Sequence, residues 1–148
     1  MKICLACSTG GHLLQILQLK NIYKKYDHFF FTFKRSMSNN LAKKDKVHFV
    51  MDPSRNPISF GVNFFQSLLI FLKEKPDVII ANGGGVVAPL CYVSKFFNKK
   101  IIFIESFSRV FEPSITGRLI YPLADLFIVQ WGSLLKFYKK AKYGGSIF

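Results

Sequence analysis

With 148 residues, half of them apolar, the chain is long enough for one domain with a buried core and too short for several. Its 21 lysines and arginines outnumber its 8 aspartates and glutamates, and the net charge of +13 favours acidic partners: phosphates, nucleic acid or an anionic membrane surface. No apolar run reaches the roughly 18 residues of a membrane span, and the N-terminus shows no signal-peptide pattern, so we expect a cytoplasmic protein that is at most peripheral to a membrane.

Strand-like and helix-like segments alternate along the sequence. We expect strands at residues 2–6, 28–33, 47–51, 77–80, 100–104 and 126–129. We expect helices at residues 13–23, 57–74, 86–97, 114–124 and 131–140, and the basic stretch 34–46 is typical of a solvated loop. Near-continuous apolar strands separated by helices predict a Rossmann-like, doubly wound parallel sheet, an α/β fold that occupies residues 1–148 as a single domain.

The three cysteines fit a reducing compartment. Cys4 and Cys7 form a C-x-x-C pattern, but residues three apart on a strand point to opposite faces. Cys91 is the only other thiol, and a structural zinc takes four ligands. We therefore expect buried structural thiols and no metal.

Three of the predicted strands end in chemically unusual sequences. Glycines let a backbone pass close to a ligand, and a following helix favours an anion at its start. Because the carboxyl ends of parallel strands meet at one edge, these sequences predict a cleft for a phosphorylated ligand, although each glycine run is also compatible with a plain tight turn. The three sequences are Ser8-Thr9-Gly10-Gly11-His12, Asn82-Gly83-Gly84-Gly85 and Glu105-Ser106-Phe107-Ser108-Arg109.

Two of these residues are candidates for acid–base chemistry. His12 lies at a predicted helix start, where the helix dipole disfavours protonation and leaves a neutral imidazole that accepts a proton. Glu105 ends an apolar strand in a chain with few acids, so it is the second candidate. The structural alternative for Glu105 is an ion pair with Arg109 or Arg118.

Several common nucleotide motifs are missing. Gly10-Gly11 lacks the G-x-G-x-x-G spacing and no acid follows the second strand, which disfavours dinucleotide binding. The chain has neither a G-x-x-x-x-G-K-[ST] loop nor a D-x-D pair. We therefore expect a metal-independent phosphate site without a cofactor.

The long helix at 57–74 carries two apolar stripes. The broader stripe is expected to face the sheet, and the narrower one is expected either to pack under a neighbouring helix or to meet a partner or a membrane. The broader stripe consists of Ile58, Val62, Phe65, Leu68, Leu69 and Leu72, and the narrower one of Phe60, Phe64 and Phe71.

The strand-end sequences carry a family resemblance. Residues 8–12, 82–89 and 104–106 resemble the N-terminal domain of MurG, a lipid-linked glycosyltransferase of the GT-B fold. The chain is more closely similar to the single-domain PssD/CpsF-type polysaccharide biosynthesis subunits and to their eukaryotic counterpart, which docks the second N-acetylglucosaminyltransferase of dolichol-linked glycan synthesis at the membrane. The similarity to the bacterial subunits is carried by residues 105–109, 113–118, 125–131 and 143–148.

The resemblance implies one half of a GT-B glycosyltransferase that is inactive alone. It implies a heterodimer with a donor-binding subunit, a nucleotide-sugar held mainly by that subunit, and inverting transfer to a polyprenyl-pyrophosphate-linked acceptor in capsule or exopolysaccharide biosynthesis. The eukaryotic subunits typically carry an N-terminal membrane anchor that is not seen in this sequence. We therefore expect amphipathic and basic surface to hold the protein on the cytoplasmic face of an anionic membrane.

The resemblance also suggests residue roles. The Gly10-Gly11 turn would receive pyrophosphate, His12 would be the base or a phosphate ligand, and Glu105 is the second candidate for the base. Further candidates for phosphate or substrate contacts are Ser8, Thr9, Asn82, Gly83, Gly84 and Gly85. Ser106, Arg109 and Arg118 are candidates for phosphate contacts.

Three other functions stay open at this stage. A non-catalytic scaffold that recruits the partner to the membrane would leave the glycine turns purely structural. A stand-alone nucleotide-binding oxidoreductase lacks its fingerprint, and a nucleic-acid binder fits the charge but no recognisable motif. We expect no nucleic acid among the partners.

Overall fold

A computed structural model describes all residues from Met1 to Phe148. It contains one seven-stranded sheet in the order β3-β2-β1-β4-β5-β6-β7, and every neighbouring pair is parallel. The predicted doubly wound α/β fold is confirmed. The strands are β1 (Lys2–Cys7), β2 (Asp27–Thr32), β3 (Val47–Phe49), β4 (Val78–Asn82), β5 (Lys100–Ile104), β6 (Leu126–Val129) and β7 (Lys142–Tyr143).

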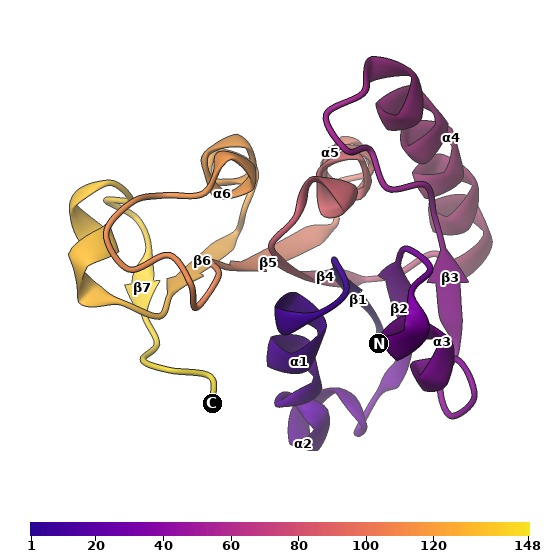
Figure 1. Cartoon of the computed structure of the whole chain (residues 1–148), viewed down its shortest axis with the longest axis horizontal. Helices are drawn as coiled ribbons and strands as arrows, with labels where there is room; N and C mark the ends of the chain where they lie inside the picture. The colour runs from indigo at the N-terminus through magenta and orange to yellow at the C-terminus, as the bar shows by residue number, and fades with distance from the viewer.

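Helices cover both faces of the sheet, α1, α2 and α3 on one and α4, α5 and α6 on the other (Figure 1). The α-helices are α1 (Gly11–Leu17), α2 (Lys20–Tyr23), α3 (Ser36–Leu41), α4 (Pro57–Glu74), α5 (Ala88–Phe96) and α6 (Ile115–Ile120). Two 3₁₀ helices, η1 (Gly85–Val87) and η2 (Gly132–Lys136), complete the fold. None of the helices combines the length and the hydropathy that a bilayer span requires.

The chain changes direction in the sheet between β1 and β4. β2 and β3 follow β1 on one side, whereas β4 pairs with the other side of β1 and continues to β7. Such a switch point opens a crevice beyond the carboxyl ends of the two central strands. The first and second glycine turns, which follow β1 and β4, therefore lie next to each other.

Each face of the sheet has its own core. Cys4 and Phe103 belong to the cluster under α4 and α5, and Cys7 and Leu13 to the cluster under α1. All three cysteines are free and buried, and Cys4 and Cys7 lie on opposite faces. The prediction of structural thiols is confirmed.

Helix α4 is oriented opposite to the prediction. Five of the six residues of the stripe that was expected to face the sheet are exposed, with Ile58 at 78%, Phe65 at 69% and Leu69 at 65%, whereas Leu68 is partly buried against the core. Phe71, expected on the narrower stripe, is only 4% exposed and stacks on Phe97 at the end of α5, so it packs under a neighbouring helix, as one of the two alternatives predicted, and does not form a membrane or partner surface. Phe60 and Phe64 lie at the flanks of the buried side and are each 40% exposed.

Polar side chains explain this orientation, because the buried side of α4 satisfies distant backbone groups. The Asn63 amide donates to the carbonyls of Met51 (2.8 Å) and Val86 (3.2 Å), and the Ser67 hydroxyl donates to Asn63 Oδ1. Burying these groups costs little once they are hydrogen-bonded, whereas the apolar periodicity alone points the other way. The helix is amphipathic with its apolar side outward.

Other differences concern short elements. The expected helix at 13–23 is interrupted at Gln18, where i→i−3 hydrogen bonds replace the α-helical ones, and the expected helix at 131–140 is reduced to η2. Within the basic stretch, α3 begins where the Ser38 hydroxyl accepts from the Arg35 amide (2.9 Å). β7 was not predicted at all, and it pairs with β6 through only two residues.

Candidate functional site

A cavity of about 380 Å³ lies at the carboxyl edge of the sheet. Four loops surround it: the turn after β1, the loop 50–56 after β3, the glycine run after β4 and the loop 105–114 after β5. The cavity therefore lies at the edge of the sheet where the strand-end sequences predicted a cleft. The lining includes His12, Asp52, Ser54, Arg55, Phe60, Gly83, Gly84, Gly85, Ser106, Ser108, Arg109, Ser114, Ile115, Thr116 and Leu119.

His12 lines this cavity at the start of α1. Its Nδ1 lies 2.5 Å from the Ser8 hydroxyl, and its ring packs on the backbone of Gly83. A Cβ at Gly83 would lie 2.1 Å from Nε2 and a Cβ at Gly84 would lie 2.7 Å from the Ser8 Cβ. Both glycines have positive φ as well, so the turn after β4 requires glycine for space and for backbone conformation.

The environment keeps His12 neutral. Burial lowers the pKa of His12 below its ordinary value of 6.5, the Glu105 carboxylate opposes this shift, and the Arg109 guanidinium adds to it. A neutral imidazole at pH 7 has one nitrogen that can accept a proton, which is what a general base requires.

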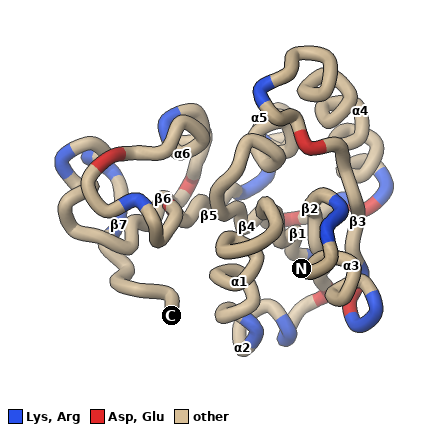
Figure 2. Tube along the Cα trace, in the orientation of Figure 1, with Lys and Arg blue, Asp and Glu red and all other residues tan.

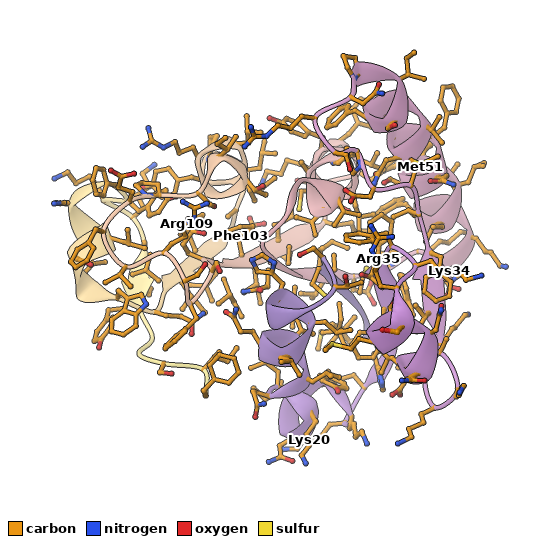
Figure 3. The ribbon with its side chains drawn as sticks, viewed as in Figure 1. Lys20, Lys34, Arg35, Met51, Phe103 and Arg109 are labelled. Atoms are coloured by element: carbon orange, nitrogen blue, oxygen red, sulfur yellow. The ribbon has the colours of Figure 1, made fainter.

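Two arginines line the cavity without a carboxylate partner. Neither Arg55 nor Arg109 takes part in an ion pair, and Figure 3 shows Arg109 on the loop between β5 and α6. Ser54 and Arg55 both have left-handed φ values, 44° and 60°, which are costly for residues with side chains. Unpaired guanidinium groups at a glycine-lined cavity are suited to phosphate oxygens.

Glu105 is completely buried beneath the cavity and does not line it. Its carboxylate accepts hydrogen bonds from the amides of Ser106 and Ser114, from the Ser114 hydroxyl (2.8 Å) and from the Tyr138 hydroxyl (2.7 Å). A Cβ at Gly117 would lie 2.2 Å from Glu105 Oε2. The carboxylate thus holds the two ends of the loop 105–114 together, and the predicted ion pair with Arg109 or Arg118 is not formed.

A second buried network fixes the floor of the site. Gln15 Oε1 accepts from Asn82 Nδ2 (3.3 Å), from the Phe107 amide (3.1 Å) and from Gln130 Nε2 (2.7 Å). Gln130 Oε1 accepts in turn from the amide of Ile147. Asn82, predicted to contact a ligand, is fully buried and outside the cavity lining.

The remaining predicted residues fall into two groups. Gly83, Gly84, Gly85, Ser106 and Arg109 line the cavity together with His12. Other predicted residues lie outside that lining: Ser8, Thr9, Gly10, Gly11 and Arg118, although Gly11 joins His12 and Ser106 in an adjoining hollow of about 250 Å³. The prediction missed the loop Asp52-Pro53-Ser54-Arg55, and the signal that finds it is the same strand-end rule applied after Phe49.

Residues 50–147 match the family described as "Oligosaccharide biosynthesis protein Alg14 like". The chain belongs to the Alg14 family. The match spans the loop after β3, the glycine run after β4 and all of the loop 105–114, so three of the four loops around the cavity lie within it.

Curated Alg14 proteins match this chain over alignments of different length. The UDP-N-acetylglucosamine transferase subunit ALG14 of Candida albicans is 40% identical over 89 residues, which cover 56% of this chain and 41% of that protein. The subunit of the same name from Mus musculus is 27% identical over 180 aligned positions, covering 99% of this chain and 83% of that protein. The chain thus spans less than half of the fungal relative and most of the mouse one.

Solved structures share the fold at low sequence identity. MurG from Acinetobacter baumannii superposes with a TM-score of 0.74 at 15% identity, over 90% of this chain and 43% of that chain. The UDP-N-acetylglucosamine 2-epimerase from Rickettsia bellii superposes with a TM-score of 0.80 at 16% identity, over 99% of this chain and 45% of that chain. The Alg14-family chain therefore has the fold of one half of these larger proteins.

Proposed function

We propose that this chain is the acceptor- and membrane-side subunit of a two-subunit inverting glycosyltransferase. A separate subunit binds the nucleotide-sugar, and the two subunits enclose the reaction between them. The carboxyl-edge cavity carries the proposal, because it combines a neutral histidine, two unpaired arginines and a glycine-lined wall. The names of the Alg14 relatives make UDP-N-acetylglucosamine the first donor to test.

In the proposed reaction His12 is the base. Nε2 takes the proton of the acceptor hydroxyl, the hydroxyl oxygen forms a bond to the anomeric carbon, and the bond from that carbon to the nucleoside diphosphate breaks. The electron pair leaves with the diphosphate, and the anomeric configuration inverts. Glu105 lies below the site and holds the loop 105–114 in place, since its oxygens already accept four hydrogen bonds.

In this proposal the two arginines of the cavity bind the acceptor diphosphate. Arg55 and Arg109 come from different loops of the cavity lining, and neither has to release a carboxylate before it binds a phosphate. Ser106 and Ser108 add hydroxyl groups on the same side of the cavity as Arg109. These groups make a phosphate site that needs no metal ion.

The outward apolar side of α4 is assigned to the membrane surface. It consists of Ile58, Val62, Phe65, Leu69 and Leu72, all exposed. The cavity lies beside the first turns of the same helix, because Phe60 on the buried side of α4 and the exposed Ile115 and Leu119 on α6 belong to its lining. A lipid-linked acceptor could then keep its chain in the bilayer while its diphosphate enters the cavity, and the net charge of +13 favours anionic lipid.

Reconstitution tests the enzymatic part of the proposal. The full chain is combined with its donor-binding subunit, UDP-N-acetylglucosamine and other sugar nucleotides, and a polyprenyl-diphosphate-linked acceptor, and transfer is followed by chromatography. We expect turnover from the pair and none from either subunit alone. Turnover by the single chain would contradict the two-subunit proposal, and full activity with both His12 and Arg109 replaced by alanine would favour the scaffold instead.

Vesicle flotation tests the membrane part. We expect the full chain to float with vesicles that contain phosphatidylglycerol and to bind less to phosphatidylcholine alone. Replacing Phe65 and Leu69 by serine should abolish flotation, and the matched control Ile22→Ser, an exposed apolar residue of α2 on the opposite face, should float normally. If the Phe65 and Leu69 variant floats but fails to bind the donor subunit, the surface is a protein interface.

The setting of the reaction is a separate part of the proposal. We propose capsule or exopolysaccharide assembly, with the chain as a PssD/CpsF-type subunit on the cytoplasmic face of the membrane. The support is the sequence similarity of residues 105–109 and 113–118. Transfer to a bacterial polyprenyl acceptor in preference to a dolichol-linked one would support this assignment, and the reverse preference would contradict it.

A further inference from the structure

Ser8 and His12 form a pair that spans the first glycine turn. Ser8 is the residue after β1 and His12 is the second residue of α1, and the Ser8 Oγ lies 2.5 Å from His12 Nδ1. This is the one hydrogen bond that the Ser8 hydroxyl makes in the structure. The hydroxyl of the neighbouring Thr9 makes no hydrogen bond. The serine hydroxyl is therefore dedicated to the imidazole.

The glycine run after β4 holds this pair in place. A Cβ at Gly83 would lie 2.1 Å from Nε2, 2.2 Å from Cδ2 and 2.7 Å from Cε1 of His12. Such close approach to three ring atoms occurs over the face of the ring; an approach along the Nε2 lone pair would leave the two neighbouring carbons farther away. Gly83 therefore supports the ring from one face and leaves the in-plane direction of Nε2 unobstructed. Gly84 supports Ser8 in the same way, because a Cβ there would lie 2.7 Å from the serine Cβ.

The reaction sets the direction of the hydrogen bond between them. A neutral imidazole carries one N–H, and the partner of one nitrogen decides whether the other is protonated. Once Nε2 has taken a proton, both nitrogens donate, so the serine oxygen has to be an acceptor at that stage. If Nδ1–H already donates to Ser8 before the reaction, no reorganisation is needed.

We propose that Ser8 is a positioning residue that accepts the Nδ1 proton of His12 and so leaves Nε2 as the proton-accepting nitrogen at the cavity. The catalytic consequence rests on the proposed function, but the tautomer does not. The charged groups that act on the imidazole are Glu105 below it and Arg109 across the cavity, and burial keeps the pKa of His12 below its ordinary value. At pH 8 the imidazole is therefore neutral and its tautomer can be measured.

Long-range ¹H–¹⁵N correlation spectra of the full chain test the proposal directly. The chain has three histidines, and the His12 signals are identified by their loss in His12→Gln. We expect a protonated Nδ1 and an unprotonated Nε2 in the wild type. In Ser8→Ala the Nδ1 proton loses its acceptor, and we expect the population with Nε2–H to increase. The matched control Thr9→Ala should leave the tautomer unchanged.

A wild-type spectrum with Nε2–H would overturn the proposal, because Ser8 would then be the donor. So would a Ser8→Ala spectrum identical to that of the wild type. Activity of the reconstituted pair gives a second readout: Ser8→Ala should lower kcat about ten- to a hundredfold with KM nearly unchanged, a typical effect of removing the partner that orients a functional imidazole. If the tautomer is as expected but His12→Ala retains full activity, the assignment of His12 as the base fails and the pairing with Ser8 stands.

Discussion

Charged side chains are paired at the amino edge of the sheet and unpaired at the carboxyl edge. At the amino ends, aspartates and glutamates meet basic side chains: all six lysine–carboxylate ion pairs and both histidine–carboxylate contacts of the molecule lie there, and Glu74 alone contacts Lys2, Lys46 and His48. At the carboxyl ends Arg55 and Arg109 have no such partner. Figure 2 shows how few acidic residues the trace carries. The acids that the chain has are used mainly for stability at one edge, and the cations of the other edge remain available to a ligand.

The largest expected effect is the loss of the titratable group at the carboxyl edge. His12→Ala should lower kcat of the reconstituted pair by about two to four orders of magnitude, because general-base catalysis contributes that much. Steady-state kinetics with the acceptor and donor measure it. The control His28→Ala removes a histidine at the amino edge, which pairs with Asp45, and should leave kcat within a few-fold. Equal losses in both variants would contradict the functional difference between the edges.

Next in size is the loss of the buried acid at the amino edge. Burial raises the pKa of Glu74, but hydrogen bonds from Lys46, His48 and Lys2 outweigh it and lower the pKa from 4.5 to about 2. Because the folded-state pKa is lowered, the stabilisation is present above pH 4.5 and is lost as the pH falls toward 2, a difference of about 3 kcal/mol. Urea denaturation across this range should show the loss in the wild type. In Glu74→Gln, stability should be lower at pH 7 and should fall less steeply with pH in that range, because only the contributions of other carboxylates with lowered pKa values, such as Asp77 and Asp125, remain.

The carboxyl edge offers the matched control for this variant. Asp52 accepts only the Ser54 amide at 3.3 Å and meets no cation. Asp52→Asn should therefore change the free energy of unfolding by less than about 0.5 kcal/mol. A large loss in Asp52→Asn, or none in Glu74→Gln, would show that the two edges contribute alike to stability.

A smaller effect is expected where a buried acid is held by neutral groups. Tyr138→Phe removes one of the four hydrogen bonds to Glu105, which should cost about 2 kcal/mol and lower the melting temperature by roughly 5 °C. Burial, the bond to Glu105 and its charge raise the pKa of Tyr138, so the hydroxyl remains a donor throughout the working range. Differential scanning calorimetry measures the shift. Tyr143→Phe, an exposed tyrosine whose hydroxyl makes no hydrogen bond, should melt like the wild type.

The smallest effect concerns the pH profile. The proposed base, His12, must be unprotonated, and its lowered pKa places the acid limb of kcat/KM below pH 6.5. Arg109 contributes to lowering the pKa of His12, so Arg109→Ala should move the limb to higher pH, besides weakening acceptor binding. Arg118→Ala, an exposed arginine outside the cavity, should not move it. If the acid limb does not move in Arg109→Ala, the arginine does not contribute to the lowered pKa of His12.

The sequence allowed the sheet to be predicted well and its longest helix badly. Six strands were predicted because they are apolar runs between helices, and the two-residue β7 has no such signal. The orientation of α4 depends on carbonyls of Met51 and Val86 that lie far from Asn63 in the sequence, which periodicity does not register.

The candidate site shows the same division. The strand-end rule found His12 and Gly83, because it needs only the order of the elements. It also found Glu105, but whether a strand-end carboxylate faces the cavity or lies below it depends on the later residues Ser114 and Tyr138, which the fold brings to it.

Because its apolar side faces outward, α4 should tolerate substitutions in a pattern opposite to that of most helices. In most helices a hydrophobic position resists polar substitution and a polar position accepts almost anything. In α4 a saturation screen for folded protein should find Phe65 and Leu69 permissive and Asn63 and Ser67 restrictive, since only the polar pair is packed against the rest of the molecule. If the proposed membrane-bound enzyme is correct, a screen for growth that depends on it would constrain both sides, so the difference between the two screens separates what α4 does for folding from what it does at a surface.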